Sequence, residues 1–252
     1  MKQVLQFQST SPQAKETLIL RVRGQEVHLQ GDWSNVFKPT GSSLVLARGF
    51  KLKRGDAVFE AGIGSGINSI LAAKLGASRI SGTDVAKEAV EWARKNADLN
   101  NVGGRTDFRH GHLFEPFNGE RYDVAFADMP FSPDMPSAVA RELGLKANML
   151  AGLCGGPTGG EATVDFVREA SKRLKPGGRV YFTIGELANV PHALNDLSKN
   201  FSVEEVHSSY SYLALDKPAY ARFLMSKGSH LDFSQRRPRF RVSVYEAKPK
   251  KR

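Results

Sequence analysis

The segment Val58–Ser78, VFEAGIGSGINSILAAKLGAS, constrains the fold of this chain more than any other. A short apolar run ends at Glu60, and Gly62, Gly64 and Gly66 follow at a spacing of two residues. Glycines lack a Cβ, so the backbone can turn sharply there and approach a ligand closely. A helical apolar pattern begins directly afterwards, and its free N–H groups face the turn. The segment predicts a strand, a turn and a helix with a ligand at the turn.

Strands and helices alternate strictly after this segment. The predicted strands cover residues 57–60, 79–83, 106–110, 122–127 and 179–184, followed by two long closing strands at 202–214 and 239–247. The predicted helices cover residues 67–75, 86–99, 161–174 and 192–199, with a turn expected at 175–178. Such alternation predicts an α/β fold with a parallel sheet and helices on both faces. Ligands of such sheets bind at the carboxyl ends of the strands, so residues just after each strand are site candidates.

The residues before this segment form a different pattern. Residues 17–31 alternate apolar and polar side chains around Arg23-Gly24, which predicts a β-hairpin. Residues 32–50 predict a lead-in loop and then a short helix, with Ser42 or Ser43 near its cap.

Composition excludes several classes of protein. The 252 residues are 40% hydrophobic and 25% charged, which excludes collagen-like, low-complexity and wholly disordered chains. The single cysteine, Cys154, cannot form an internal disulfide, so no oxidising compartment is implied. No apolar run approaches the roughly 20 residues of a membrane helix, and the first residues lack a signal-peptide core. We therefore expect a cytoplasmic protein without a membrane partner. The scattered histidines predict no metal site.

The glycine spacing excludes two nucleotide-binding fingerprints. A dinucleotide fingerprint requires a glycine five positions after Gly62, where Ile67 stands, and no Gly-Lys-Ser/Thr of a phosphate-binding loop follows. The pattern E-x-G-x-G-x-G instead resembles the nucleoside-contacting loop of the S-adenosylmethionine-dependent methyltransferases. An acid at the start of the loop suits a ligand with a cationic amine and sulfonium and no phosphate. The resemblance implies a doubly wound, mostly parallel, seven-stranded Rossmann-like sheet with the N-terminal hairpin attached, and S-adenosylmethionine as the cofactor.

The same resemblance assigns the cofactor contacts. Asp84 follows the second strand, where such enzymes accept hydrogen bonds from both ribose hydroxyls. Residues 111–114, Gly-His-Leu-Phe, resemble the family's Gly-Asp-Leu-Phe, whose Asp approaches the adenine amine. His112 takes that position, either as a contact or as a simple loop residue. The implied cofactor-binding residues are Glu60, Gly62, Gly64, Gly66, Asp84 and His112. The alternative is a glycine-rich turn with an unrelated surface Asp.

The loop Asp128-Met129-Pro130-Phe131 follows the fourth strand. It resembles the (Asn/Asp/Ser)-Pro-Pro-(Tyr/Phe) motif of methyltransferases that act on planar nitrogens, although Met129 replaces the first proline. The Asp128 carboxylate and a carbonyl oxygen of Met129 or Pro130 would accept two N–H bonds and aim the nitrogen lone pair at the methyl group. Phe131 would supply a stacking face. We therefore expect Asp128, Pro130 and Phe131 to be catalytic; the alternative is an ordinary proline-rich loop.

The resemblance covers residues 36–186 and suggests the domain organisation. Residues 36–46 resemble the segment that closes over the cofactor. We expect a hairpin extension at 1–35, a methyltransferase-like catalytic domain at 36–247 with an insertion at 216–238, and a basic tail at 248–252. The hairpin begins near residue 17, which leaves no room for the helical domain of the release-factor enzyme and argues against a release factor as substrate.

Positive charge is concentrated near the C-terminus. The formal net charge is +10, and Lys217–Arg252 alone contains eleven Lys or Arg against two acids. This cluster predicts a phosphate-binding surface for RNA, DNA or a nucleotide-bearing substrate, with Arg236, Arg237 and Arg239 as substrate-binding residues. The alternative is a charged edge strand and a solubilising terminus.

Together these features favour methylation of an amine or amide nitrogen on a nucleic acid or another phosphate-bearing substrate. One alternative is a small-molecule or peptide natural-product tailoring enzyme. Another is transfer of the 3-amino-3-carboxypropyl group, which releases methylthioadenosine instead of S-adenosylhomocysteine. A third is a nucleic-acid-binding module without enzyme activity, which would not bind S-adenosylmethionine.

Overall fold

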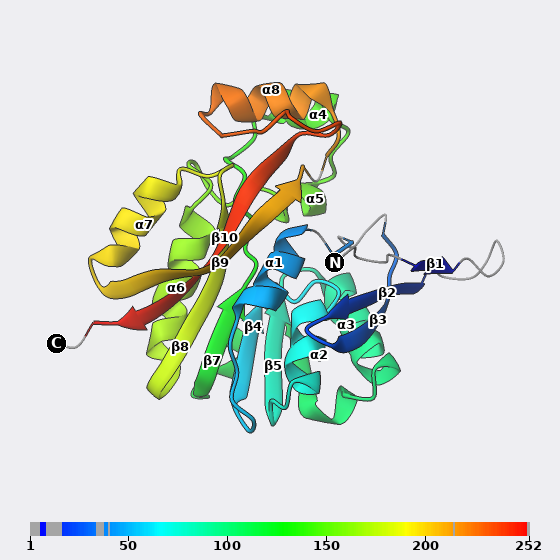
Figure 1. The fold of residues 1–252 in the computed structure, drawn as a ribbon, viewed down its shortest axis with the longest axis vertical. Coiled ribbons are helices and arrows are strands. Elements are labelled where there is room, and N and C mark those ends of the chain that lie inside the picture. Colours follow the sequence, from blue (N-terminus) through cyan, green and yellow to red (C-terminus); the bar gives the residue numbers. More distant parts are fainter. Residues whose placement is uncertain (1–5, 9–16, 34–37, 40, 214, 251–252) are drawn as a thin grey trace. The chain divides into compact units, whose positions relative to one another are not determined.

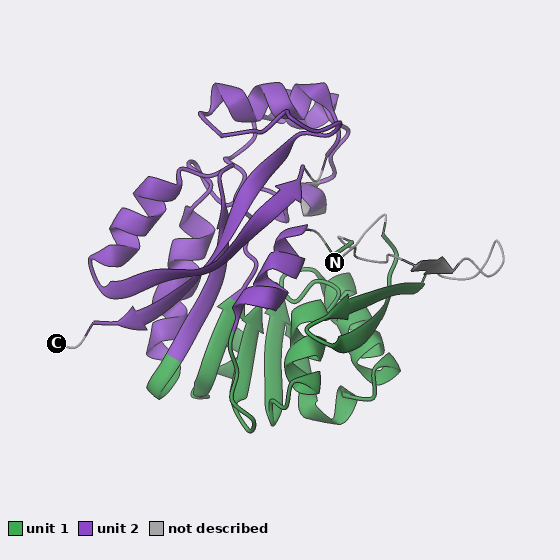
Figure 2. Ribbon diagram, in the orientation of Figure 1, with its two compact units in different colours: residues 1–39, 51–126, 173–178 green, residues 40–50, 127–172, 179–252 purple. Residues whose placement is uncertain are grey.

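The computed structural model describes residues 6–8, 17–33, 38–39, 41–213 and 215–250. Several sequence predictions therefore lie partly outside the described residues. These are the first residues of the N-terminal extension, residues 36, 37 and 40 of the cofactor-closing segment, residue 214 of a closing strand, and residues 251–252 of the tail. The chain divides into two compact units (Figure 2). Unit 1 contains residues 1–39, 51–126 and 173–178, and unit 2 contains residues 40–50, 127–172 and 179–252.

Seven strands form the main sheet in the order β6-β5-β4-β7-β8-β10-β9 (Figure 1). Their bounds are β4 Ala57–Ala61, β5 Arg79–Asp84, β6 Thr106–His110, β7 Tyr122–Ala127, β8 Leu174–Gly185, β9 Phe201–Tyr212 and β10 Arg239–Pro249. β5 pairs in parallel with both β4 and β6. β10 runs antiparallel to β8 and β9. The predicted mostly parallel, seven-stranded α/β sheet is confirmed.

The helices predicted from sequence are present. They are α1 Gly41–Gly49, α2 Ile67–Lys74, α3 Lys87–Leu99, α6 Glu161–Lys172 and α7 Val190–Ser198. Further short helices were not predicted: α4 Ser137–Glu142, α5 Ala147–Ala151, α8 Pro218–Ser226, and the 3-10 turns η1 Gly103–Arg105 and η2 Glu115–Phe117. α8 lies in the predicted insertion between the two closing strands, and α4 and α5 follow the loop that begins at Asp128.

The N-terminal hairpin is confirmed as β2 Thr17–Val22 and β3 Gln25–Gln30, with β1 Gln6–Gln8 on its outer edge. Arg23 and Gly24 both have positive φ, 52° and 76°, as the tight turn of a two-residue hairpin requires. β3 lies against α3 of the same unit, and side-chain amides of α3 form hydrogen bonds with the backbone of β3. Asn96 exchanges two hydrogen bonds with the backbone of Gln30, and Asn100 exchanges two with that of His28.

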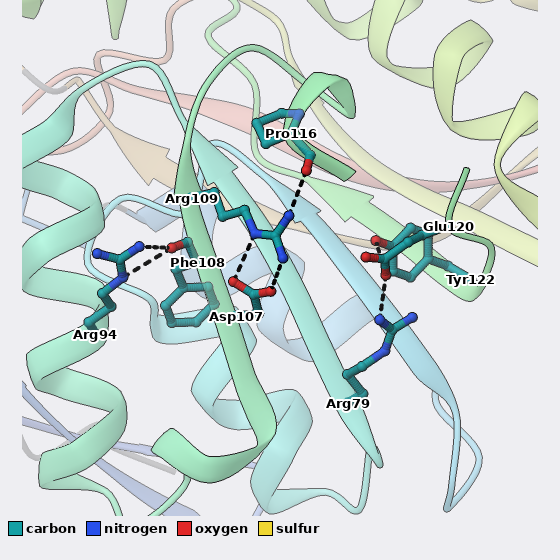
Figure 3. Close-up of polar contacts among 8 residues, drawn as sticks. All are labelled: Arg79, Arg94, Asp107, Phe108, Arg109, Pro116, Glu120 and Tyr122. Atoms are coloured by element: carbon teal, nitrogen blue, oxygen red, sulfur yellow. Dashed lines mark hydrogen bonds and ion pairs between the residues drawn. The ribbon is translucent and has the colours of Figure 1, made fainter. Parts of the chain in front are cut away.

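Aromatic packing and arginine contacts stabilise unit 1. The rings of Phe59 and Phe114 stack with centroids 3.8 Å apart. Figure 3 shows the polar contacts around β5 and β6. Arg94 donates to the carbonyl of Phe108, while Arg109 donates to the Asp107 carboxylate on its own strand. β6 is an edge strand of the sheet, and paired charges on an edge discourage association with other strands.

Unit 2 is built around β9 and β10, with α1 packed against both. A Cβ added to Gly49 of α1 would lie 2.7 Å from the Val244 side chain, so glycine allows the helix to approach β10 closely. The rings of Phe182 and Tyr245 stack at 5.5 Å, and both residues are buried. These contacts hold the end of α1 against β10 and pack the last part of β8, and both elements carry residues important for the site.

One local prediction was wrong. Residues 175–178 were expected to form a turn before the fifth strand, but β8 already begins at Leu174. Hydrogen bonds explain the early start. The carbonyl of Leu174 accepts from Arg121, and Lys175 pairs with Asp123 at 2.7 Å, so the segment is held beside the start of β7.

The described residues bear on two kinds of partner, a membrane and a metal ion. None of the helices there is long and apolar enough to cross a membrane. The same part of the chain holds no group of three or more His, Cys, Asp or Glu side chains suited to a metal ion.

Candidate functional site

The glycine turn after β4 is fixed by its own backbone. Gly62, Gly64 and Gly66 have φ of 68°, 50° and 84°, which other residues adopt only with strain. The N–H groups of Gly62 and Ile63 donate to the carbonyl of Thr83 at 2.8 and 3.1 Å, which ties the turn to β5. A Cβ on Gly62 or Gly64 would meet nothing within 4 Å. One side of the turn is therefore open, and a ligand can lie directly against the backbone.

Asp84, the last residue of β5, lies beside this turn. Its Oδ2 accepts from the N–H of Gly64 at 2.9 Å and its Oδ1 from the N–H of Ala86 at 2.9 Å. Burial raises the pKa of Asp84, and the backbone donors oppose that rise. The backbone N–H of Val85 is a third donor that favours the charged form. A carboxylate has about four acceptor positions, so Asp84 can still accept from a ligand. Such a carboxylate suits a ribose hydroxyl.

The turn fits a nucleoside without phosphates. Phosphate-binding turns present free backbone N–H groups to the anion. Here the N–H groups of Gly62 and Ile63 are bonded to Thr83, that of Gly64 to Asp84, and that of Gly66 to the carbonyl of Ile63 at 2.7 Å. Open glycine backbone beside an acceptor carboxylate therefore matches the adenosyl part of S-adenosylmethionine.

The other two predicted cofactor residues have different surroundings. Glu60 is 1% exposed, and its carboxylate accepts from the hydroxyl of Ser69 in α2. This hydrogen bond ties the start of α2 to β4. Glu60 therefore stabilises the glycine turn that connects these two elements. His112 is exposed after β6, with Nδ1 3.9 Å from Glu115 Oε1. Both residues belong to unit 1, as do the three glycines and Asp84.

In unit 2, Asp128 follows β7 directly and is held by three hydroxyl groups. Its Oδ2 accepts from Ser42 Oγ at 2.9 Å and from Ser43 Oγ at 2.8 Å. Its Oδ1 accepts from Thr183 Oγ1 at 2.5 Å. Burial raises the pKa of Asp128, and the three hydrogen bonds partly offset the rise. The result is a carboxylate with a fixed orientation in shielded surroundings.

Phe131 of the predicted catalytic loop packs inward, whereas Pro130 is half-buried. Phe131 is 9% exposed, and its ring lies edge-on to Phe240 at 5.8 Å. A Cβ on Gly185 would lie 2.8 Å from the same ring. Phe131 therefore anchors the loop in the core of unit 2. A Cβ on Gly155 would lie 2.1 Å from the carbonyl oxygen of Pro130, so only glycine allows that segment to approach the loop.

Four of these supporting residues were not assigned a site role from sequence. Ser42 and Ser43 were expected near a helix cap, in the segment that resembles the one closing over the cofactor. Neither Thr183 in β8 nor Gly155, in the loop before α6, was given a role. Ser42, Ser43 and Thr183 are 86, 85 and 55 positions from Asp128. No local spacing reveals such contacts. The repeated glycines of residues 155–160 were the one available signal, because clustered glycines accompany close backbone approach.

The three predicted substrate-binding arginines also lie in unit 2. Arg236 is exposed. Arg237 pairs with Asp216 at 3.1 Å, and Arg239 pairs with Asp232 at 2.7 Å. Hydrogen bonds from Ser234 and Arg239 lower the pKa of Asp232 to about 2. Because two of the three guanidinium groups already have carboxylate partners, this surface attracts phosphates less than its sequence indicates.

Comparisons with known proteins link these features to one chemistry. The family described as ribosomal protein L11 methyltransferase matches residues 39–129. A putative protein N5-glutamine methyltransferase of Methanocaldococcus jannaschii is 30% identical over 188 residues, covering 74% of this chain and 90% of that protein. A ribosomal protein L11 methyltransferase of Halalkalibacterium halodurans is 30% identical over 179 residues, covering 70% of this chain and 47% of that protein. This chain thus spans about half the length of that second relative.

Solved structures share the fold at lower identity. The ribosomal protein L11 methylase of Lactobacillus delbrueckii has a TM-score of 0.52 and 18% identity, covering 85% of this chain and 84% of that chain. A Thermus thermophilus 16S rRNA methyltransferase in complex with S-adenosylmethionine and guanosine has a TM-score of 0.58 and 18% identity, covering 95% of this chain and 52% of that one. The sequence relatives are named as protein methyltransferases, which gives no support to the expected nucleic-acid partner. The planar-nitrogen motif itself is not confirmed by any of these likenesses.

Proposed function

We propose, from the premise that this chain belongs to the S-adenosylmethionine-dependent methyltransferases, that it methylates the side-chain amide nitrogen of a glutamine in a protein. One observation carries the choice of acceptor: the match to the protein N5-glutamine methyltransferase covers 90% of that relative. The clamped Asp128 carboxylate supports the same choice, since it offers an acceptor for an amide N–H. The matches to the ribosomal protein enzymes cover a smaller share of those proteins.

The residues of unit 1 would hold the cofactor. S-adenosylmethionine supplies a methyl carbon bonded to a positively charged sulfur, which makes that carbon electrophilic. Asp84, held by backbone donors beside the turn, would accept from the ribose of the cofactor. The open side of Gly62 and Gly64 admits the nucleoside against the backbone. Glu60 acts indirectly, because its bond to Ser69 positions the helix that follows the turn.

Asp128 would orient the acceptor. The nitrogen lone pair of a primary amide is delocalised into the carbonyl group, so the nitrogen is a poor nucleophile. A carboxylate that accepts a hydrogen bond from one N–H of the amide increases the electron density on the nitrogen. It also fixes the orientation of the amide. A backbone carbonyl oxygen of the Asp128–Pro130 loop would take the second N–H. Positioning and electrostatics are the contributions that these residues make to the rate.

The acceptor is a protein in this proposal because of charge as well as relatives. A nucleic-acid site needs cationic side chains that are free to neutralise phosphates. Arg237 and Arg239 are already paired with carboxylates. The two arginines stack on the exposed rings of Tyr212 and Tyr210, and both arginine and tyrosine are enriched at protein interfaces.

A label-transfer experiment tests the proposal. The purified protein is incubated with cell extract and S-adenosylmethionine that carries different labels on the methyl and carboxyl carbons. We expect the methyl label alone in the protein fraction, N5-methylglutamine in peptides by mass spectrometry, and S-adenosylhomocysteine as by-product. Label in RNA, or carboxyl label in any fraction with release of methylthioadenosine, would contradict the proposal. The variant Asp128→Ala is the negative control.

A further inference from the structure

We propose that Ser42, Ser43 and Thr183 form a hydroxyl clamp that fixes Asp128 as a carboxylate and leaves one acceptor position, on Oδ1, for a single N–H of the acceptor. The inference rests on the proposed function, because it assigns a task to the site that would orient the glutamine amide. It makes the three hydroxyl residues positioning residues, which act on the reaction only through Asp128.

The Asp128 carboxylate has one hydrogen-bond acceptor position that the three hydroxyl groups do not occupy. A carboxylate has about four lone-pair positions, two on each oxygen. The two serine hydroxyls occupy both positions on Oδ2, at 2.9 and 2.8 Å. Thr183 occupies one position on Oδ1 at 2.5 Å. Within the described chain these are the hydrogen bonds recorded for the carboxylate, so Oδ1 keeps one position.

The clamp favours the charged form of Asp128. A hydroxyl that donates to an anion forms a stronger hydrogen bond than one that donates to a neutral carboxyl. Thr183 is fully buried and Ser42 is 7% exposed, so water competes little for these bonds. Both serines lie in the first turn of α1, whose positive dipole end also favours a negative charge. The clamp therefore compensates in part for the desolvation of the carboxylate.

A charged Asp128 also balances the reaction. As a carbon–nitrogen bond forms and the bond between that carbon and sulfur breaks, the amide nitrogen must release one proton. The nitrogen–hydrogen bond that breaks is the one donated to Oδ1, and the new oxygen–hydrogen bond forms at that atom. A protonated Asp128 could not receive this proton. The clamp thus supports both the orientation of the acceptor and the departure of its proton.

Paired substitutions test the clamp. Thr183→Val keeps the shape of the side chain and removes the hydroxyl, whereas Thr183→Ser keeps the hydroxyl. We expect Thr183→Val, and the double variant Ser42→Ala with Ser43→Ala, to lower kcat about tenfold each while cofactor affinity stays unchanged. These hydrogen bonds lower the pKa of Asp128, so their loss should raise it. The acid limb of the kcat profile should then move to higher pH. Thr183→Ser should leave that limb in place.

A buried serine outside the clamp provides the matched control. Ser211 is 3% exposed in the same unit, and its hydroxyl does not bond to Asp128. Ser211→Ala should leave kcat and the pH profile unchanged. The clamp is refuted if Thr183→Val and Thr183→Ser lower kcat equally, if the acid limb does not move, or if Ser211→Ala has the same effect as the clamp variants.

A second measurement does not depend on the acceptor. The ¹³Cγ resonance of Asp128, assigned by its loss in Asp128→Ala, is titrated by NMR in the wild type and in the Ser42→Ala, Ser43→Ala variant. We expect its midpoint at higher pH in the variant; an unchanged midpoint would overturn the clamp. A wild-type protein that methylates no glutamine refutes the proposed function, and the titration still decides the clamp.

Discussion

Asp84 in unit 1 and Asp128 in unit 2 are both carboxylates whose pKa is raised by burial, yet they are held in different ways. Backbone N–H groups of Gly64 and Ala86 hold Asp84. Side-chain hydroxyls from α1 and β8 hold Asp128. The first arrangement is a property of the turn itself, because any sequence that forms this turn supplies the donors.

The second arrangement depends on individual side chains. Each hydroxyl on Asp128 can be removed by one substitution that leaves the backbone intact, whereas the donors on Asp84 cannot be removed in this way. Under the proposed function, cofactor binding depends on the backbone of unit 1. The acceptor chemistry of unit 2 then depends on single side chains and can be changed one residue at a time.

The largest effect is expected for Asp128→Ala. Without the carboxylate, the acceptor amide loses both its orientation and its proton acceptor, so kcat should fall about 100- to 1000-fold. Cofactor affinity by calorimetry should remain within about twofold, since Asp84 and the glycine turn belong to the other unit. Asp134→Ala, an exposed carboxylate of the same loop, is the control and should retain activity. Equal losses in kcat and cofactor affinity would erase the distinction between the two carboxylates.

Asp84→Ala should produce the opposite pattern. Two ribose hydroxyls lose their acceptor, and the N–H of Gly64 loses its partner, so cofactor affinity should fall about 10- to 100-fold. At saturating cofactor, kcat should be largely preserved. The control is Asp107→Ala, which removes an exposed carboxylate from the same unit. Calorimetry with S-adenosylhomocysteine measures the change, and normal affinity in Asp84→Ala would show that the turn holds the nucleoside without it.

The same difference explains what the sequence could and could not predict. The hairpin, the alternating strands and helices and the glycine turn follow from local patterns, so their elements were predicted within a few residues. Asp84 was predicted because its place depends on the turn beside it. The clamp on Asp128 was missed because its donors come from α1 and β8, far away in sequence. Phe131 was expected to face the substrate, yet an aromatic side chain after a strand also suits the core, and the approach of Gly185 that buries it has no local signal.

Asn96→Ala tests a third way of holding the site, through a side-chain amide. The Asn96 amide bonds to the Gln30 backbone of the hairpin and donates to the Ser65 carbonyl in the glycine turn at 2.9 Å. Its removal leaves these buried backbone groups unpaired, so the free energy of unfolding should fall by about 2–4 kcal/mol. Urea denaturation measures the loss, with the exposed Asn118→Ala as control. Cofactor affinity should weaken as well. An unchanged affinity would show that the Asn96 contacts do not influence cofactor binding by the glycine turn.

Asp128→Asn should stabilise the protein while it impairs catalysis. The folded-state pKa of Asp128 is raised above the unfolded value, so its favourable contribution is complete below the unfolded pKa and is lost as pH rises through the folded pKa. Above that range the folded state bears the cost of a desolvated charge, which the neutral amide avoids. Thermal melts should therefore show a higher Tm for Asp128→Asn than for the wild type at neutral pH. The difference should disappear in acid, and a constant difference across pH would point to packing instead of charge.

The smallest effect is expected for Arg239→Ala, which concerns a third carboxylate, Asp232. Unlike Asp84 and Asp128, Asp232 has a lowered pKa, about 2, because Ser234 and Arg239 bond to it at the surface. Arg239 is also stacked on Tyr210 at 4.3 Å, so little of its charge is available to a phosphate. Affinity for a protein substrate should change less than about threefold in Arg239→Ala and between 50 and 200 mM salt. A nucleic-acid substrate that neutralised six or more cations would lose about a thousandfold or more over that salt range. A steep salt dependence that Arg239→Ala reduces would therefore restore the phosphate-binding interpretation of the basic C-terminal region and reject a protein acceptor.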